Sequence, residues 1–142
     1  MTVYLDTSSI VKLYVEESGR ADVRKSIDGA TVIATSHVAY TESHAALARR
    51  RRERALSARD FAAAKAEFES DWLRFVTIPV SLDLCREAGG LAEQYQLRGF
   101  DSIHLASFAE MIRGLQGADD VVFSSFDAKL NAAARRLART IK

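Results

Sequence analysis

Short β-prone runs alternate with longer stretches of helical periodicity along this chain. Four runs rich in Val, Ile, Thr, Tyr or Phe predict strands. They lie at residues 2–5 (TVYL), 30–36 (ATVIATS), 75–80 (FVTIPV) and 118–125 (ADDVVFSS). Apolar residues at helical spacing predict seven helices between and after them. These cover residues 8–17, 20–28, 37–54, 57–75, 82–96, 102–113 and 128–140, and Ser57 is a plausible cap of the fourth.

This alternation predicts an α/β fold, in which helices flank a short and mostly parallel sheet. The 142 residues suit one core, and no repeat, low-complexity tract or linker divides them. We therefore expect a single domain over residues 1–142. In sheets of this kind, ligands collect beyond the carboxyl ends of the strands, so those ends are where a site is to be sought.

Composition narrows the class of protein. Hydrophobic residues make up 48% and charged residues 27% of the chain, which is typical of a globular rather than a disordered protein. No apolar run approaches the ~20 residues that span a bilayer, and the start MTVYLDTSSI lacks the pattern of a signal peptide. The single cysteine, Cys85, excludes an internal disulfide and fits a reducing compartment. We expect a cytoplasmic protein with no membrane contact, and Cys85 as a small buried residue.

Charge is nearly balanced overall but not along the chain. The net charge of +1 does not indicate a nucleic-acid binder. The stretch ALARRRRERALSAR, however, places six arginines against Glu53 alone. A run of this kind is usually a solvated helix face. The alternative is that Arg49, Arg50, Arg51 and Arg52 contact RNA phosphates or a protein partner.

Four acidic residues stand out by position. Asp6 and Asp127 each lie where a predicted strand gives way to a helix, so both belong to the same edge of the sheet. Asp101 precedes a predicted helix whose apolar side carries Leu105, Phe108 and Ile112 at positions i+4, i+7 and i+11 from it. It therefore lies in line with a face that should be buried. The fourth acid, Glu42, lies inside the predicted helix 37–54, beside its apolar side.

Helix capping is the alternative explanation for three of these acids, because Asp is a common N-cap. It does not explain Glu42. Converging carboxylates would repel one another unless they were paired or bound a metal. The cations of the chain are poorly placed by spacing to pair with them, although Arg98 and Lys12 could lie nearby. Carboxylates without a Cys or His cluster favour the hard ions Mg²⁺ or Mn²⁺ over Zn²⁺. His104, one turn after Asp101, is expected to be a hydrogen-bonded residue at the edge of the core, with a catalytic role as the alternative.

Four stretches of the chain resemble the PIN-domain family, and within it the VapC-type toxin ribonucleases. They are YLDTSSIVKLYVEE, TSHVAYTESHAAL, YQLRGFDSIHLASF and VFSSFDAKLNAAA, in the order typical of the family and over essentially the whole chain. The resemblance implies a PIN-like α/β/α sandwich. It assigns the metal-binding acids to Asp6, Glu42 and Asp101 and a fourth catalytic acid to Asp127, with Ser125, Thr7 and Ser8 as supporting hydroxyls. Family members often continue to a final short strand, whereas this chain stops at RTIK.

The resemblance also implies an activity and partners. It predicts a Mg²⁺-dependent endoribonuclease, with Mn²⁺ as a substitute, that cleaves RNA and is blocked by a VapB-like antitoxin. It further predicts a homodimer. Two alternatives remain open at this point. One is a PIN-like nuclease that serves RNA maturation, and the other is a non-catalytic module whose acidic edge binds Mg²⁺ or the basic tail of a partner.

Overall fold

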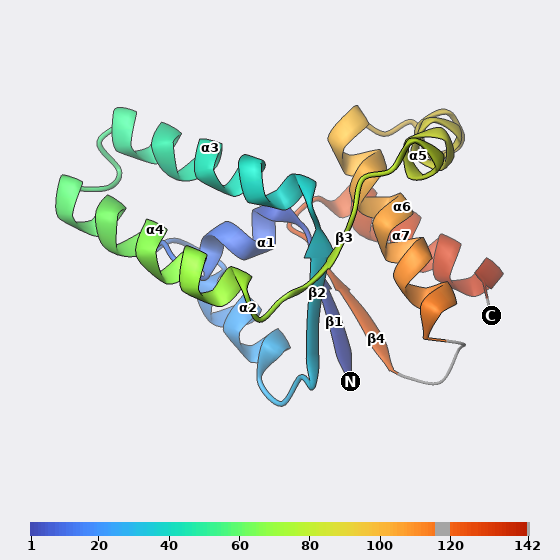
Figure 1. Cartoon of the computed structure of the whole chain (residues 1–142), viewed down its shortest axis with the longest axis horizontal. Coiled ribbons are helices and arrows are strands. Elements are labelled where there is room, and N and C mark those ends of the chain that lie inside the picture. Colours follow the sequence, from blue (N-terminus) through green and yellow to red (C-terminus); the bar gives the residue numbers. More distant parts are fainter. Residues whose placement is uncertain (116–119, 142) are drawn as a thin grey trace.

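A four-stranded parallel sheet forms the centre of the molecule (Figure 1). The computed structural model describes residues 1–115 and 120–141. The strands are β1 (Thr2–Leu5), β2 (Val32–Ser36), β3 (Val76–Ile78) and β4 (Val121–Ser124), in the order β3-β2-β1-β4. All four lie within the runs predicted from the sequence. Ala118 and Asp119, with which the last predicted run began, lie outside the described residues.

Helices cover both faces of this sheet. They are α1 (Thr7–Lys12), α2 (Arg20–Ile27), α3 (Val38–Arg52), α4 (Ala58–Trp72), α5 (Leu82–Tyr95), α6 (Gly99–Gly114) and α7 (Ala128–Ile141). Helices α1 to α4 lie on one side and α5 to α7 on the other (Figure 1). Strand β1 contributes to both cores, because Tyr4 packs on one side while Val3 and Leu5 pack on the other. The predicted α/β/α arrangement is confirmed.

The start of α6 differs from the sequence prediction. The helix begins at Gly99 rather than near Ser102, and Arg98 occupies the N-cap position without a side-chain cap. The Ser102 Oγ donates to the Arg98 carbonyl at 2.8 Å, one turn back. Asp101 therefore lies in the first turn of α6, where its carboxylate is not used as an N-cap. Leu105, Phe108 and Ile112 are buried, as their spacing predicted.

The prediction that Cys85 is buried is wrong. The buried side of α5 carries Leu84, Ala88 and Leu91, and Cys85 lies one position further round the helix, where it is exposed. At the other end of the chain, α7 is the last described element, and no fifth strand exists within residues 1–115 and 120–141. None of the described helices is long and apolar enough to cross a membrane.

Candidate active site

Asp6 lies at the carboxyl end of the central strand, next to the end of β4. The two strands pair in parallel with Leu5 opposite Ser124, and the Asp6 amide donates to the Ser124 carbonyl at 3.1 Å. The buried Asp6 carboxylate accepts hydrogen bonds from the Ser9 amide at 3.0 Å, from Ser8 Oγ at 2.7 Å and from Ser125 Oγ at 2.5 Å. Asp6 therefore caps α1, as the capping alternative required, and is also fixed by two hydroxyl groups.

Glu42 reaches the same edge from α3. Its Oε1 accepts from Thr7 Oγ1 at 2.6 Å and from His104 Nε2 at 3.0 Å. Partial burial raises the pKa of Glu42, but the hydrogen bonds from His104 and Thr7 lower it, and the net pKa lies below its ordinary value. The carboxylate is consequently ionised at neutral pH. Both partners hold Oε1, and Oε2 accepts no hydrogen bond within the described part of the chain.

His104 links this carboxylate to the core. The ring is buried, and its Nδ1 lies 2.9 Å from the Tyr4 hydroxyl. Because a carboxylate can only accept, Nε2 carries the proton toward Glu42, and Nδ1 then accepts from Tyr4. Burial raises the pKa of Tyr4 well above its ordinary value, so its hydroxyl stays protonated and can donate. His104 is the hydrogen-bonded core-edge residue that was expected, and a neutral ring satisfies both of its partners.

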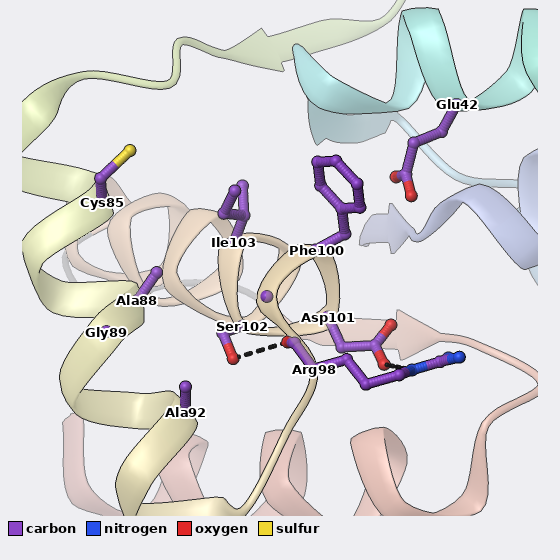
Figure 2. A pocket seen from close by; sticks show the side chains of 11 residues that line it. Glu42, Cys85, Ala88, Gly89, Ala92, Arg98, Phe100, Asp101, Ser102 and Ile103 are labelled. Carbon is purple, nitrogen blue, oxygen red and sulfur yellow. Dashed lines mark hydrogen bonds and ion pairs between the residues drawn. The ribbon is translucent and has the colours of Figure 1, made fainter.

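Arg98 lies between the remaining two acids. Its Nε donates to Asp101 Oδ2 at 3.0 Å (Figure 2), and its Nη2 lies 3.8 Å from Asp127 Oδ2. The hydrogen bond to Asp101, followed by the charges of Asp127 and Glu42, raises the pKa of Arg98. Asp127 also caps α7 by accepting from the Leu130 amide at 2.9 Å. Arg98, one of the two cations that could lie near these acids, is therefore found beside them. Its i,i+3 spacing from Asp101 was the signal available in the sequence.

The expected supporting hydroxyls each touch an acid of this edge. Thr7 donates to Glu42, and Ser8 donates to Asp6. Ser125 contacts two of the acidic residues, since its Oγ donates to Asp6 and accepts from the Asp127 amide at 3.0 Å. Lys12, the other cation considered from the sequence, turns away to Glu17 at 3.2 Å and to the Ser18 carbonyl at 2.8 Å. Each of the three hydroxyls thus fixes an acid of this edge, and Ser125 links Asp6 to Asp127.

The donors at this edge suit a hard divalent ion. They are carboxylate and hydroxyl oxygens, which Mg²⁺ and Mn²⁺ prefer. Within residues 1–115 and 120–141, however, no three His, Cys, Asp or Glu side chains converge as a ready metal cage. Each carboxylate is instead held by its own hydrogen-bond donors. Since Mg²⁺ usually keeps several waters and binds through one or two carboxylates, the chemistry of this donor set fits such an ion without a closed cage.

The arginine run lies at the opposite end of α3 from the acidic edge (Figure 1). Arg49 is seven residues beyond Glu42, which is about 10 Å along the helix. Arg50 pairs with Glu17 through two hydrogen bonds, of 2.9 and 3.1 Å. Arg49 pairs with Glu53 at 2.9 Å. Arg50 therefore forms an ion pair within the protein, whereas the Arg52 side chain is exposed.

We expect Glu17→Gln to destabilise the protein at neutral pH. The hydrogen bond from Arg50, opposed by partial burial and supported by Lys12, lowers the pKa of Glu17. A lowered folded-state pKa gives stability that is present above the unfolded pKa of about 4.3 and is lost as the pH falls through the folded value. Denaturation should show a loss of about 1 kcal/mol at pH 7 and a smaller loss at an acidic pH below the unfolded pKa, because the carboxyl becomes protonated as the pH falls through its folded pKa. Glu16→Gln is the control, because Glu16 is 94% exposed. An equal loss at both pH values would contradict the charge pairing.

Comparison with known proteins identifies the family of this chain. A family model described as PIN domain matches residues 3–136. Two relatives from Mycobacterium tuberculosis are each 32% identical over 132 residues, covering 93% of this chain and 88% of the relative. They are Ribonuclease VapC45 of strain CDC 1551 / Oshkosh and Ribonuclease VapC49 of strain ATCC 25618 / H37Rv. The chain belongs to the PIN-domain family, among its VapC-type members.

Proposed function

We propose that this protein is a metal-dependent endoribonuclease, acting as the toxin of a VapBC-type toxin–antitoxin pair. The observation that carries the proposal is the gathering of Asp6, Glu42, Asp101 and Asp127 at one edge of the parallel sheet. Relatives named ribonucleases support RNA as the substrate. Tyr4 and His104 hold one of these carboxylates from the core, which supports a preorganised catalytic site.

Each acidic residue has a proposed role. Asp6, Glu42 and Asp101 would hold Mg²⁺, or Mn²⁺ in its place, directly or through water. Asp127 would be a further ligand or would orient the attacking water. A bound ion of this kind lowers the pKa of a water molecule and neutralises the charge that develops on the phosphate. Thr7 and His104 fix Oε1 of Glu42, which leaves Oε2 free to act as a ligand.

Two serines hold the Asp6 carboxylate in place. Ser8 and Ser125 hold the Asp6 carboxylate from two sides, so that it does not need to reorganise during the reaction.

The RNA must present a flexible or looped strand at this site, because base pairing in a duplex shields the backbone and the bases.

Cleavage of RNA with and without metal tests the proposal. The protein is expected to cut total RNA in Mg²⁺, to stop in excess EDTA and to resume when Mg²⁺ is restored. The products can be followed on denaturing gels. Absence of cleavage with both Mg²⁺ and Mn²⁺ would favour the non-catalytic module, and cleavage that persists in EDTA would exclude the metal mechanism.

The proposed partners are RNA, a second copy of this chain and a VapB-like antitoxin. The ion pair of Arg98 with Asp101 supports the last of these, since an arginine supplied by an antitoxin could bind the carboxylates in the same way. Light scattering tests the homodimer, and co-purification with the product of a neighbouring reading frame tests the antitoxin. Absence of such a frame would favour the RNA-maturation role. The cytoplasm remains the proposed compartment, and residues 1–142 the proposed single domain.

The arginine run keeps two proposed binding partners, RNA phosphates or a protein. Because Arg50 is engaged by Glu17, the informative change is the double substitution Arg51→Gln and Arg52→Gln. Weaker RNA affinity with a flatter salt dependence would indicate phosphate binding, at roughly one unit of log–log slope for each phosphate that is no longer neutralised. Unchanged RNA binding with weaker partner binding would indicate a protein surface, and no change in either assay a solvated face.

A further inference from the structure

A pocket of about 620 Å³ opens beside the acidic edge, between α5 and α6 (Figure 2). Its volume falls within the range of roughly 300–1,000 Å³ that is usual for ligand sites. Glu42 and Asp101 line one end of it, so the pocket is continuous with the proposed cleavage centre. Small side chains of α5 and apolar side chains of α6 form most of the remaining wall. These are Cys85, Ala88, Gly89, Ala92, Phe100 and Ile103.

The glycines of this wall have no packing role inside the described molecule. A Cβ added at Gly89 or at Gly99 would meet no atom within 4 Å. Glycine in the middle of a helix is nevertheless unfavourable relative to alanine, and Gly89 lies in the middle of α5. What its missing side chain provides is a flat surface of exposed backbone on the pocket side, where a flat ligand can approach closely.

Two side chains at the pocket have the chemistry that binds unpaired bases. Phe100 is 57% exposed, which is unusual for a large apolar residue in a helix that is otherwise mostly buried. In Figure 2 its ring points into the space between α6 and Glu42. The Arg98 side chain is 83% exposed and lies at the end of the pocket that holds Asp101. Aromatic rings and guanidinium planes are the groups on which proteins stack splayed bases of single-stranded RNA.

We propose that this pocket binds one unpaired nucleobase of the RNA substrate, next to the bond that is cleaved. The inference rests on the proposed function. A nucleotide whose phosphate lies at Glu42 and Asp101 has its base within immediate reach of the pocket, because these two residues line both sites. The base then lies against the flat wall at Gly89 and stacks on Phe100. A base in a duplex cannot enter, so the pocket selects single-stranded or looped RNA.

A matched pair of substitutions in α5 tests this proposal. Gly89→Leu places a side chain in the pocket, and its Cβ meets no atom of the fold. Gly90→Leu makes the same change at a neighbouring residue that does not line the pocket. Equal melting temperatures of the two variants establish that both are folded. The probes are single-stranded oligoribonucleotides, measured for binding in EDTA by fluorescence anisotropy and for cleavage in Mg²⁺.

The expected result is a fall in affinity confined to Gly89→Leu, of about tenfold or more, the scale of losing one stacked base. Gly90→Leu should stay within about twofold of the wild type, because it leaves the stacking site unchanged. A series of oligonucleotides can each carry one abasic nucleotide at a different position. At one of these positions the abasic change should lower the RNA affinity of the wild type but not that of Gly89→Leu. Phe100→Leu, which keeps the apolar character but removes the ring, should lose part of the affinity.

Two outcomes would overturn the proposal. One is equal RNA binding and cleavage by the two glycine variants. The other is unchanged RNA binding by Gly89→Leu together with loss of dimerisation or of antitoxin binding, which would make the pocket a protein-docking site. Failure of the proposed function is a separate result, because a wild-type protein that never cleaves RNA can still be measured for base binding in EDTA.

Discussion

Asp6→Asn is expected to abolish RNA cleavage while leaving the fold intact. The substitution keeps Oδ1, which accepts from the Ser9 amide and Ser8 Oγ, so α1 remains capped. The new amide faces Ser125 Oγ, a hydroxyl that can accept as well as donate. What is lost is the negative charge and one ligand oxygen. We expect initial cleavage rates at fixed Mg²⁺ to fall by at least the roughly 10–100-fold that is typical of losing a group that only supports a metal ligand.

The control for this experiment is Asp83→Asn, in the first turn of α5. Its side chain is 93% exposed and pairs with the exposed Arg86. It should cleave RNA at the wild-type rate. Circular dichroism and melting curves should be native for both variants. Activity of Asp6→Asn within about tenfold of the wild type, at matched Mg²⁺, would remove Asp6 from the metal site and leave it as a helix cap.

Removal of metal should affect the stability of the wild type and of Asp101→Asn to different extents. A ligand that binds only the folded state stabilises it by RT ln(1 + [L]/Kd), about 2.7 kcal/mol at a hundredfold excess over Kd. For a chain of this size the gain corresponds to a rise in Tm of about 5–10 °C. If the substitution weakens metal binding about 10–100-fold, the variant gains only about 0.4–1.4 kcal/mol under the same conditions.

Arg98 affects the relative stability of the two proteins in EDTA. Repulsion between carboxylates alone would make Asp101→Asn melt higher than the wild type in EDTA. Because Arg98 already neutralises this end of the edge, we expect the two proteins to melt within about 1 kcal/mol of each other without metal. Four melting curves, two proteins with Mg²⁺ or EDTA, decide the question. Equal shifts for both proteins would contradict a role of Asp101 in metal binding.

Local pattern was enough to predict the layers of this fold and much of the acidic edge. Val3 and Leu5 face one core and Tyr4 faces the other. This alternation follows directly from predicting a strand, because side chains alternate between the two faces of a strand. Asp6 and Asp127 could be placed at one edge because parallel strands end on the same side. The strand-to-helix junctions therefore predict that Asp6 and Asp127 are neighbours, and Ser125 joins them in the structure.

The contacts that hold the site could not be read from spacing. Tyr4 and His104 lie 100 residues apart in sequence, and no local rule joins them. The start of α6 predicted near Ser102 is three residues too late, and the Ser102 hydroxyl donates back to the Arg98 carbonyl in the preceding turn. The earlier start at Gly99 moved Asp101 into the helix and brought Arg98 beside it. Cys85 was misplaced because one step round a helix decides between core and solvent.

The most direct test of the central claim is anomalous diffraction from crystals soaked in Mn²⁺, at a concentration that supports cleavage. The account predicts an anomalous peak among Asp6, Glu42 and Asp101, with the Arg98 side chain moved away from Asp101. Thr7 and His104 should still hold Oε1 of Glu42, as they do in this structure. Absence of a peak at this edge, with Arg98 still paired to Asp101, would contradict the assignment of these carboxylates to the metal.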